Sequence, residues 1–406
     1  MPSLHFENAL DTHRLALLQA LGQAAHAHGT KLWAVGGVVR DTLLGVPVLD
    51  IDLTSETPAD GLGRTLTSAL GGSVGPITPF ATVKLTISGQ HFDLATTRTE
   101  TYPQPGTLPS VTLSTLDQDL RRRDFTVNAM AASLAPADFG EVSDPHGGRA
   151  DLDAGVIRVL HDRSFRDDPT RTFRAVRYAV RLGFHIERTT ARWMRRDAPL
   201  INRLSGTRVR HEIERMLIDP RGATALMKSH RRGLLGQIHP AFRADAVGRA
   251  LLSATRRNLR GLELLAALMY SLSTSDVAAV THRLSLPKRQ AILALATVQL
   301  REAEPQLSGA APSAVDLVAR NIPQAALSAL VAVSESAPVR ASLRSYMQRS
   351  KFVLRHLDGE ALARIGVPSG PPTGQALQTL RSAELDGTVR SRQGATRFIQ
   401  RWLEER

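Results

Sequence analysis

Asp50 and Asp52 occupy alternate positions in the segment VLDIDL, residues 48–53. Successive side chains of a strand point to opposite faces, so both carboxylates project from the same face of a predicted strand. Two carboxylates this close raise each other's pKa unless a cation lies between them. Such oxygen ligands suit Mg²⁺, which takes one or two carboxylates together with substrate phosphates. The spacing predicts a magnesium site, and the alternative is a pair of surface acids.

A glycine turn precedes this strand. Gly36 and Gly37 follow the apolar segment KLWAV and lead into a predicted helix over 38–44, which contains Arg40 and Asp41. Glycine allows a ligand to approach the backbone closely, and the amides at a helix N-terminus can hold phosphate oxygens. A phosphate cradle beside a metal-binding pair outlines a nucleotidyl-transfer site.

A second polar segment reads DLRRRDFTVNAMA and contains Arg123, Asp124 and Asn128. Its three consecutive arginines can contact a triphosphate. Asp124 and Asn128 are four residues apart, so on a helix they share a face that can hold a ribose or order an arginine. The alternative is a solvated basic turn.

A third segment contains Asp168 and Arg171, three residues apart on a predicted helix with Pro169 in its first turn. A carboxylate accepts from an exocyclic amine, and a guanidinium donates to a ring nitrogen or carbonyl oxygen. Cytosine and adenine present an amine next to an acceptor, whereas guanine and uracil present the reverse order. The alternative is an intrahelical salt bridge worth ~0.3–0.5 kcal/mol.

The elements that must position these residues form a small α/β unit with a mixed or antiparallel sheet, followed by helices. In the front part the pattern predicts helices over 8–29, 38–44, 59–70 and 121–134, strands over 31–37, 48–53, 82–88 and 91–96, and an exposed loop over 102–112. Ser88-Gly89-Gln90 is predicted to be a hairpin turn. From about residue 162 the chain is predicted to be helical, over 164–184, 207–218, 222–235, 246–257, 261–272, 276–284, 288–302 and 313–357, with a Pro/Gly-rich break at 365–375.

Charge is unevenly distributed along the 406 residues, whose net charge is +13. Residues 1–145 carry nine basic and 15 acidic residues, whereas the remainder carries 42 basic and 23 acidic residues. An acidic front joined to a basic rear suggests a polyanion bound along the rear, with one end delivered to the front. A bias toward arginine codons can explain the choice of arginine over lysine, but it does not explain this segregation.

The composition excludes sites built from cysteine, and the hydropathy pattern disfavours a secreted or membrane-spanning protein. The chain has no cysteine, which excludes disulfides and thiolate metal sites. Neither a signal-peptide pattern nor a stretch of ~20 apolar residues is found, so we expect a cytoplasmic protein without a membrane partner. The sequence does not indicate an oligomeric state.

Taken in order, these segments resemble the tRNA nucleotidyltransferase and bacterial poly(A) polymerase family, and most closely the bacterial-type CCA-, CC- and A-adding enzymes. Two further segments fit: DPHGGRADLDAGVIRVL, which by itself reads as a structural connector, and SGTRVRHEIERML with Ser205, Arg208 and Glu212. The match is close over about residues 30–215, and looser in the tail segment GVPSGPPTGQALQTLRSAELDG.

The resemblance implies an α+β protein with a nucleotidyltransferase head (1–145), a neck that selects the nucleobase (146–220), and a helical body (221–330) and tail (331–406) that bind the acceptor arm of tRNA. It implies transfer of CMP, AMP or both from CTP and ATP to the tRNA 3′ end, with Mg²⁺ as cofactor. The implied roles are Mg²⁺ ligation by Asp50 and Asp52; triphosphate binding by Gly36, Gly37, Arg40 and Asp41; triphosphate and ribose contacts by Arg123, Asp124 and Asn128; base pairing by Asp168 and Arg171; and nucleotide binding by Arg174 and Arg177.

The chain departs from the family pattern at two places. Position 167 is Asp where the family's base-selecting motif begins with Glu, which affects how Arg171 is held. The loop over 102–112 has no charged residue, whereas that of full CCA-adding enzymes carries an Asp and arginines and is linked with the switch from CTP to ATP. A CC-only or A-only activity is therefore one expectation. The rival functions are a poly(A) polymerase acting on RNA 3′ ends and a non-catalytic RNA-binding protein.

Overall fold

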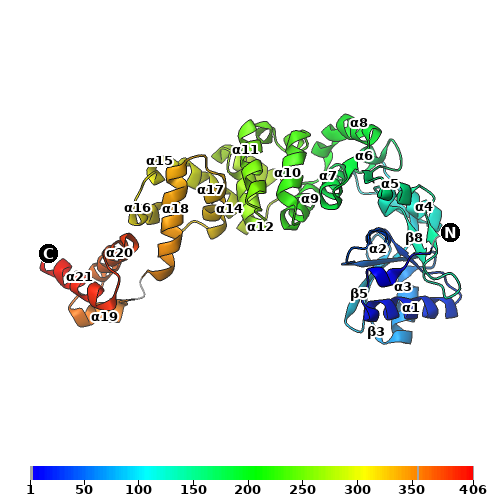
Figure 1. Ribbon diagram of the computed structural model, residues 1–406, viewed down its shortest axis with the longest axis horizontal. Coiled ribbons are helices and arrows are strands. Elements are labelled where there is room, and N and C mark those ends of the chain that lie inside the picture. The colour runs from blue at the N-terminus through cyan, green and yellow to red at the C-terminus, as the bar shows by residue number, and fades with distance from the viewer. Residues whose placement is uncertain (1–2, 354–355, 406) are drawn as a thin grey trace. The chain divides into compact units, whose positions relative to one another are not determined.

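The chain divides into two compact units, Met1–Leu204 and Ser205–Arg406 (Figure 1). The computed structural model describes residues 3–353 and 356–405. The first unit contains a mixed sheet with helices, and the second consists of helices throughout its described residues, so the predicted α+β class is confirmed. The division into head, neck, body and tail stays a prediction. Within the described ranges, no helix combines the length and apolar character needed to cross a membrane.

A seven-stranded sheet lies at the centre of the first unit. Its order is β3-β4-β5-β2-β1-β8-β9, with β1 (Trp33–Val35), β2 (Ile51–Ser55), β3 (Gly72–Val74), β4 (Thr82–Ile87), β5 (Gln90–Thr96), β8 (Ala131–Ser133) and β9 (Val142–Ser143). Strands β2 and β5 are parallel, and the other neighbours are antiparallel. Ser88 and Gly89 join β4 to β5 with φ of 49° and 76°, as in a type I′ turn, so the predicted hairpin is confirmed.

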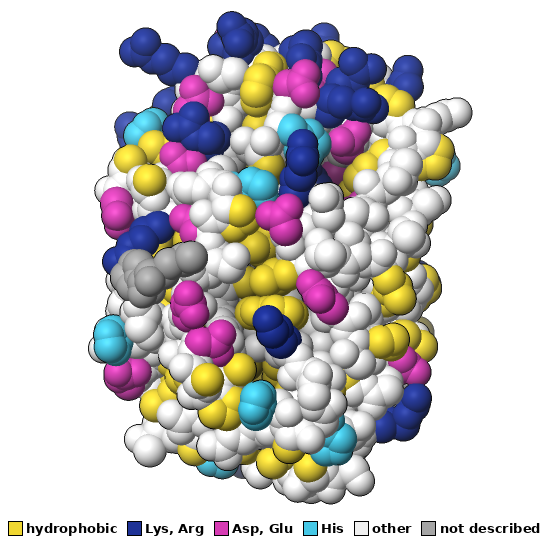
Figure 2. Space-filling model, turned by 90° about the vertical axis from the view of Figure 1, so that its right-hand side faces the viewer, with side chains coloured by type: hydrophobic (Ala, Val, Ile, Leu, Met, Phe, Trp, Pro, Cys, Tyr) yellow, Lys and Arg dark blue, Asp and Glu magenta, His cyan; other side chains and the backbone are white. Residues whose placement is uncertain are grey.

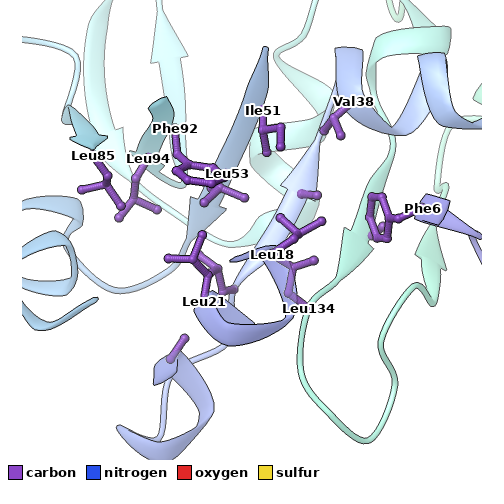
Figure 3. Packing of buried hydrophobic residues seen from close by; sticks show 14 of the residues in the cluster. Phe6, Leu18, Leu21, Val38, Ile51, Leu53, Leu85, Phe92, Leu94 and Leu134 are labelled. Carbon is purple, nitrogen blue, oxygen red and sulfur yellow. The ribbon is translucent and has the colours of Figure 1, made fainter. Parts of the chain in front are cut away.

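One face of this sheet is covered by two helices, α1 (Thr12–Ala27) and α3 (Ala59–Leu70). Leu18 and Leu21 of α1 pack there against Ile51 and Leu53 of β2, all of them buried (Figure 3). Asp52, between those two strand residues, is exposed on the opposite face. The core on one face of β2 therefore fixes which face presents the carboxylate.

The prediction of a helix over 121–134 is wrong. Helix α4 (Leu116–Arg121) ends where that helix was expected to begin, and Phe125 has extended backbone angles. A short 3-10 turn (Thr126–Asn128) follows, and the chain then enters β8, which pairs with β1. The pairing with β1 satisfies backbone groups that a helix would have satisfied locally, so tertiary structure overrides the helical spacing.

Two further predicted elements differ from the structure. The loop predicted over 102–112 is shorter, because β6 (Arg98–Thr101) and β7 (Ser110–Leu113) form a hairpin. The helix expected around Pro169 is interrupted: α6 (Ser164–Asp167) and α7 (Arg171–Leu182) are separate, and Pro169 lies in the turn between them. Asp168 is extended, with φ −133° and ψ 96°, because proline disfavours helical angles in the residue before it.

The second unit contains helices α9 to α21. Their bounds are α9 (Gly206–Ile218), α10 (Gly222–Arg231), α11 (Asp245–Arg256), α12 (Gly261–Met269), α13 (Thr274–Arg283), α14 (Lys288–Glu302), α15 (Glu304–Leu307), α16 (Pro312–Ala319), α17 (Gln324–Val333), α18 (Ala337–Arg349), α19 (Gly359–Ile365), α20 (Pro371–Asp386) and α21 (Arg392–Glu404). The helix predicted over 288–302 matches α14, and the break predicted over 365–375 is narrower, since α20 begins at Pro371.

Basic side chains gather at the upper end of the face in Figure 2, the end at which Figure 1 places α8 (Arg188–Asp197). Exposed arginines of this helix are Arg188, Arg192, Arg195 and Arg196. Consecutive turns of one helix therefore present a positive surface in the first unit.

Candidate active site

The glycine turn places a helix N-terminus beside a guanidinium. Gly36 follows β1 with φ 71° and ψ −116°, angles open to glycine but strained for other residues, and it precedes α2 (Gly37–Leu43). A β-carbon at Gly36 would lie 2.8 Å from Nη1 of Arg123. The turn and the arginine segment, far apart in sequence, therefore meet at this point.

We expect Gly36→Ala to weaken nucleotide binding as well as to destabilise the fold. The new methyl group would displace the mobile end of Arg123, and the positive φ would cost of order 1–3 kcal/mol. Gly29→Ala is the matched control, since Gly29 has φ 69° and a β-carbon there would meet no described part of the chain beyond its neighbours within 4 Å. Steady-state kinetics and thermal unfolding should show similar stability losses for both variants, but a rise in KM of about 10-fold only for Gly36→Ala. Equal KM values would contradict the contact.

The two candidate metal ligands lie at the start of β2. Asp50 immediately precedes the strand and Asp52 is its second residue; both are exposed. Among the described residues no group of three or more Asp, Glu or His side chains is arranged to hold a metal ion. A cation at this pair would therefore take its remaining ligands from water and from substrate phosphates, as Mg²⁺ commonly does.

Asp93 of β5 is a neighbour that the sequence reasoning missed. It lies directly opposite Asp52 in the parallel β2–β5 register. Partial withdrawal from water raises the pKa of Asp52, and the carboxylates of Asp93 and Asp50 raise it further, against the opposing effect of Arg123. Asp52 therefore lies near two acids, Asp50 and Asp93, and two arginines, Arg123 and Arg40. A cation bound at the aspartate pair would offset the repulsion among the carboxylates.

Asp124 is the centre of a buried polar network. Its Oδ2 accepts from Nε of Arg174 at 2.8 Å, and its Oδ1 accepts from Nδ2 of Asn128 at 3.0 Å and from the amide of Phe125 at 2.9 Å. Burial alone would raise the pKa of Asp124, but Arg174 and the hydrogen bond from Asn128 lower it to about 2. The predicted proximity of Asp124 and Asn128 is present, made by a 3-10 turn instead of an α-helix.

Arg40 extends this network to the glycine-turn helix. Its guanidinium donates to Oδ1 of Asn128, and forms two hydrogen bonds with Asp41, Nε to Oδ1 at 2.8 Å and Nη2 to Oδ2 at 2.9 Å. Arg40 is 3% exposed and Asp41 6% exposed. Both side chains are thus committed to neighbouring residues, an arrangement that suits a scaffold for the site better than direct contact with a triphosphate.

The ring of Tyr178 on α7 lies among three guanidinium groups. The Cζ atoms of Arg40, Arg174 and Arg177 are 5.2, 5.6 and 4.8 Å from the ring centroid. Attraction between cations and the ring face offsets part of the repulsion among these arginines. The structure therefore brings Arg174 and Arg177, predicted as nucleotide-binding residues, next to the glycine-turn helix.

The predicted base-pairing residues are held by different partners. Oδ1 of Asp168 accepts from the amide of Thr170 at 3.0 Å and from its hydroxyl at 2.6 Å. Arg171 is 6% exposed and donates from Nη1 to the Ser164 hydroxyl and from Nη2 to the carbonyl of Arg122, both at 2.7 Å. Arg171 is therefore attached to the residue that precedes Arg123 in the arginine segment.

The segment DPHGGRADLDAGVIRVL, which begins at Asp144, connects and holds neighbouring elements, as its sequence suggested. Asp144 accepts from the amides of Gly148 and Arg149 at 2.7 and 2.9 Å, and so satisfies the first two amides of α5 (Gly148–Asp153). Asp151 accepts from the hydroxyl of Thr126 at 2.6 Å and from Nε of Arg158 at 2.9 Å. These contacts fix the 3-10 turn that carries Asn128. In the second unit, Ser205 caps α9, as the side chain accepts from the amide of Arg208.

Two family models match the chain. Residues 32–158 match the family described as "Poly A polymerase head domain". Residues 183–245 match the family described as "Probable RNA and SrmB- binding site of polymerase A". The first match covers the glycine turn, Asp50 and Asp52, and most of the Asp124 network, and it ends before α7.

Relatives with related activities match nearly the whole chain. An A-adding tRNA nucleotidyltransferase of Halalkalibacterium halodurans is 28% identical, over 100% of this chain and 98% of its own length. A CC-adding tRNA nucleotidyltransferase of Geobacter sulfurreducens is 30% identical, over 93% of this chain and 94% of its own. The solved structure of the Thermotoga maritima CCA-adding enzyme complexed with tRNA superposes with a TM-score of 0.83 at 27% identity, over 99% of each chain.

Proposed function

The chain belongs to the tRNA nucleotidyltransferase family, and from this premise we propose that it adds CMP, AMP or both to the 3′ end of tRNA without a nucleic-acid template. The observation that carries the proposal is that the glycine turn, the Asp50/Asp52 pair, the Asp124 network and Arg171 lie within one compact unit. A tRNA substrate implies a cytoplasmic site of action.

We propose Mg²⁺ as the divalent ion on which nucleotidyl transfer in this family depends. Asp50 and Asp52 would hold it, and Asp93, opposite Asp52 in the sheet, places a third negative charge nearby. Hard carboxylate oxygens match this ion, and no thiolate donor is available, since the chain has no cysteine. When bound, the ion would stabilise charge on the phosphate oxygens.

In the proposed reaction, the 3′-hydroxyl oxygen of tRNA attacks the α-phosphorus of the nucleotide in line. A new oxygen–phosphorus bond forms, the bond to the bridging oxygen breaks, and pyrophosphate leaves. Arg123 and the amides after Gly36 would hold the triphosphate, and Asp168 and Arg171 would pair with the base. The buried network of Arg40, Asp41, Asp124, Asn128 and Arg174 would keep these groups in register.

The tRNA would lie along basic helical surface. The arginines of α8 support an RNA contact in the first unit, and the excess of 29 basic over 16 acidic residues after position 204 supports further contacts in the second. The proposal includes a neck over 146–220 that selects the nucleobase, and a body over 221–330 and a tail over 331–406 that bind tRNA. Segment 102–112 carries no charge, which supports an activity limited to C or to A addition.

A product-resolved assay tests the proposed function. The purified chain is offered tRNA ending before CCA, after C, and after CC, with CTP or ATP separately, and the products are separated to one nucleotide. We expect addition of C, of A, or of both in order, with termination at the completed end. Long A tails would instead favour a poly(A) polymerase, and no addition to any of the three tRNAs would favour a non-catalytic RNA-binding protein.

A further inference from the structure

A buried ion cluster lies beside the candidate active site and includes Arg122, the middle arginine of the segment predicted to contact a triphosphate. It consists of Arg98, Glu100, Asp119 and Arg122, and we call it the hairpin cluster because two of its members lie on β6. Oε1 of Glu100 accepts from Nη1 of Arg122 at 2.8 Å and from Nη2 of Arg98 at 3.2 Å. Oδ1 of Asp119 accepts from Nη2 of Arg122 at 2.7 Å. Their side chains are only 0–18% exposed.

The cluster fixes Arg122 on every side. Its Nη1 goes to Glu100, its Nη2 to Asp119, and its Nε to the carbonyl of Arg98 at 3.1 Å. Burial alone would raise the pKa of Asp119, but Arg123 and Arg122 hold it below its usual value, so this acid is charged at neutral pH. A guanidinium bonded in this way cannot rotate without breaking charge-assisted hydrogen bonds.

The backbone of Arg122 carries this constraint to the base-pairing residue. Arg122 is the C-cap residue of α4, where the last carbonyls of a helix have no partner within the helix. Its carbonyl accepts from Nη2 of Arg171 at 2.7 Å, while the Ser164 hydroxyl holds Nη1 of the same guanidinium. The direction of the Arg171 guanidinium is therefore set by a group whose own side chain is clamped by the hairpin cluster.

The segment between β6 and β7 is attached to the same cluster. The hydroxyl of Tyr102 donates to Oε2 of Glu100 at 2.7 Å, and burial raises the pKa of Tyr102 well above its usual value, so this donor keeps its proton. Both oxygens of Glu100 are thus occupied by protein groups. Farther along the same segment, the buried Gly106 lies against Arg203 and Leu204 at the end of the first unit.

We propose that Glu100 is a positioning residue for nucleobase choice, acting through Arg122 on the guanidinium of Arg171. The inference rests on the proposed function, because it assigns Arg171 to base recognition. Arg171 can favour cytosine over uracil, or adenine over guanine, only while the N–H donors that Ser164 and Arg122 leave free point at the acceptor on the base. A displacement of about 1 Å in a positioned group can cost on the order of 10²-fold in rate, so a small shift of the Arg122 carbonyl is enough to change selection.

Glu100→Gln tests this inference directly. The substitution keeps the size of the side chain but removes its charge, so that Asp119 alone offsets the repulsion between Arg98 and Arg122. We expect the preference in kcat/KM for the correct base over its counterpart of equal ring size, CTP over UTP or ATP over GTP, to fall by at least about 10-fold. The rate with the correct nucleotide should fall much less. Tyr102→Phe, which keeps all charges of the cluster, should shift the preference in the same direction and less far.

A matched pair in the second unit provides the control. Tyr270 donates to Glu304 at 2.7 Å, the same chemistry in a partly buried setting outside the first unit. Glu304→Gln should leave the base preference at the wild-type value. A double-mutant cycle completes the test: in an Arg171→Ala background, Glu100→Gln should change the preference no further.

The outcomes separate the inference from the function on which it rests. If the wild-type chain adds no nucleotide to any tRNA, the proposed function fails. If the wild type adds nucleotide selectively, and Glu100→Gln lowers the rates with correct and incorrect nucleotides equally, then Glu100 has a merely structural role. The inference is also overturned if the preference is unchanged, or if its loss persists undiminished without Arg171.

Discussion

Asp52→Asn is expected to reduce nucleotide addition by about 10³-fold or more while leaving the fold intact. The substitution removes one charge from a pair that would hold the divalent ion, and a 10³-fold loss corresponds to about 4 kcal/mol of transition-state stabilisation. The fold should tolerate it, because Asp52 is exposed whereas the neighbouring Ile51 and Leu53 supply the core. Single-turnover incorporation of labelled nucleotide into tRNA measures the effect.

Asp60→Asn is the control for this experiment. Asp60 is also an acid in the first unit, but it lies on α3 and pairs with Arg64 at 3.0 Å on the surface. Its replacement should leave incorporation within about twofold of wild type, since exposed pairs contribute little. Retention of more than roughly a tenth of wild-type activity by Asp52→Asn would remove this carboxylate from the catalytic assignment.

Asp124→Asn is expected to cause the largest loss of stability among single changes in the site, about 3 kcal/mol in the free energy of unfolding. Asp124 is buried, and its loss leaves Arg174 without the carboxylate that now accepts two of its hydrogen bonds. Removing one partner of such a pair costs more than the pair itself contributes. Chemical denaturation at neutral pH measures the effect, and Glu335→Gln, in an exposed pair with Arg249, should change stability by less than about 0.5 kcal/mol.

The lowered pKa of Asp124 predicts that the free energy of unfolding decreases as the pH falls. The pKa of Asp124 is about 2 in the folded chain, below the ordinary value of 3.8. Its contribution, about 2 kcal/mol by linkage, is therefore complete above pH ~4 and disappears as the pH falls toward ~2. The difference in stability between wild type and Asp124→Asn should narrow over that interval. A difference independent of pH would show that the charge of Asp124 does not contribute.

The sequence predicted the parts of the site that follow from local periodicity. Alternation in β2 was sufficient to place Asp52 opposite the buried Ile51 and Leu53, and the Ser88-Gly89 turn identified the hairpin. The role of Asp93 was not predictable in this way, because its place beside Asp52 depends on a parallel pairing between strands that are distant in sequence. No signal within either strand specifies that pairing.

The features that the sequence did not reveal have a common physical origin. The spacing of Asp124 and Asn128 fits a helix, yet their hydrogen bond is made by a 3-10 turn held in place by sheet pairing and by Asp151. Arg40 reads as a ligand for phosphate in the sequence, and only the folded chain reveals its commitment to Asp41 and Asn128. Local pattern cannot distinguish a guanidinium that contacts substrate from one that holds the site together.

The central claim is that this chain transfers a nucleotide to the 3′-hydroxyl of tRNA. The most direct measurement is the ratio of pyrophosphate released to nucleotide added, on tRNA with an incomplete end and on the same tRNA terminated by a 3′-deoxynucleotide. We predict one pyrophosphate for each nucleotide added to the first substrate, and neither product with the second. Pyrophosphate release that is equal for both tRNAs, or nucleotide addition to the 3′-deoxy substrate, would contradict the account.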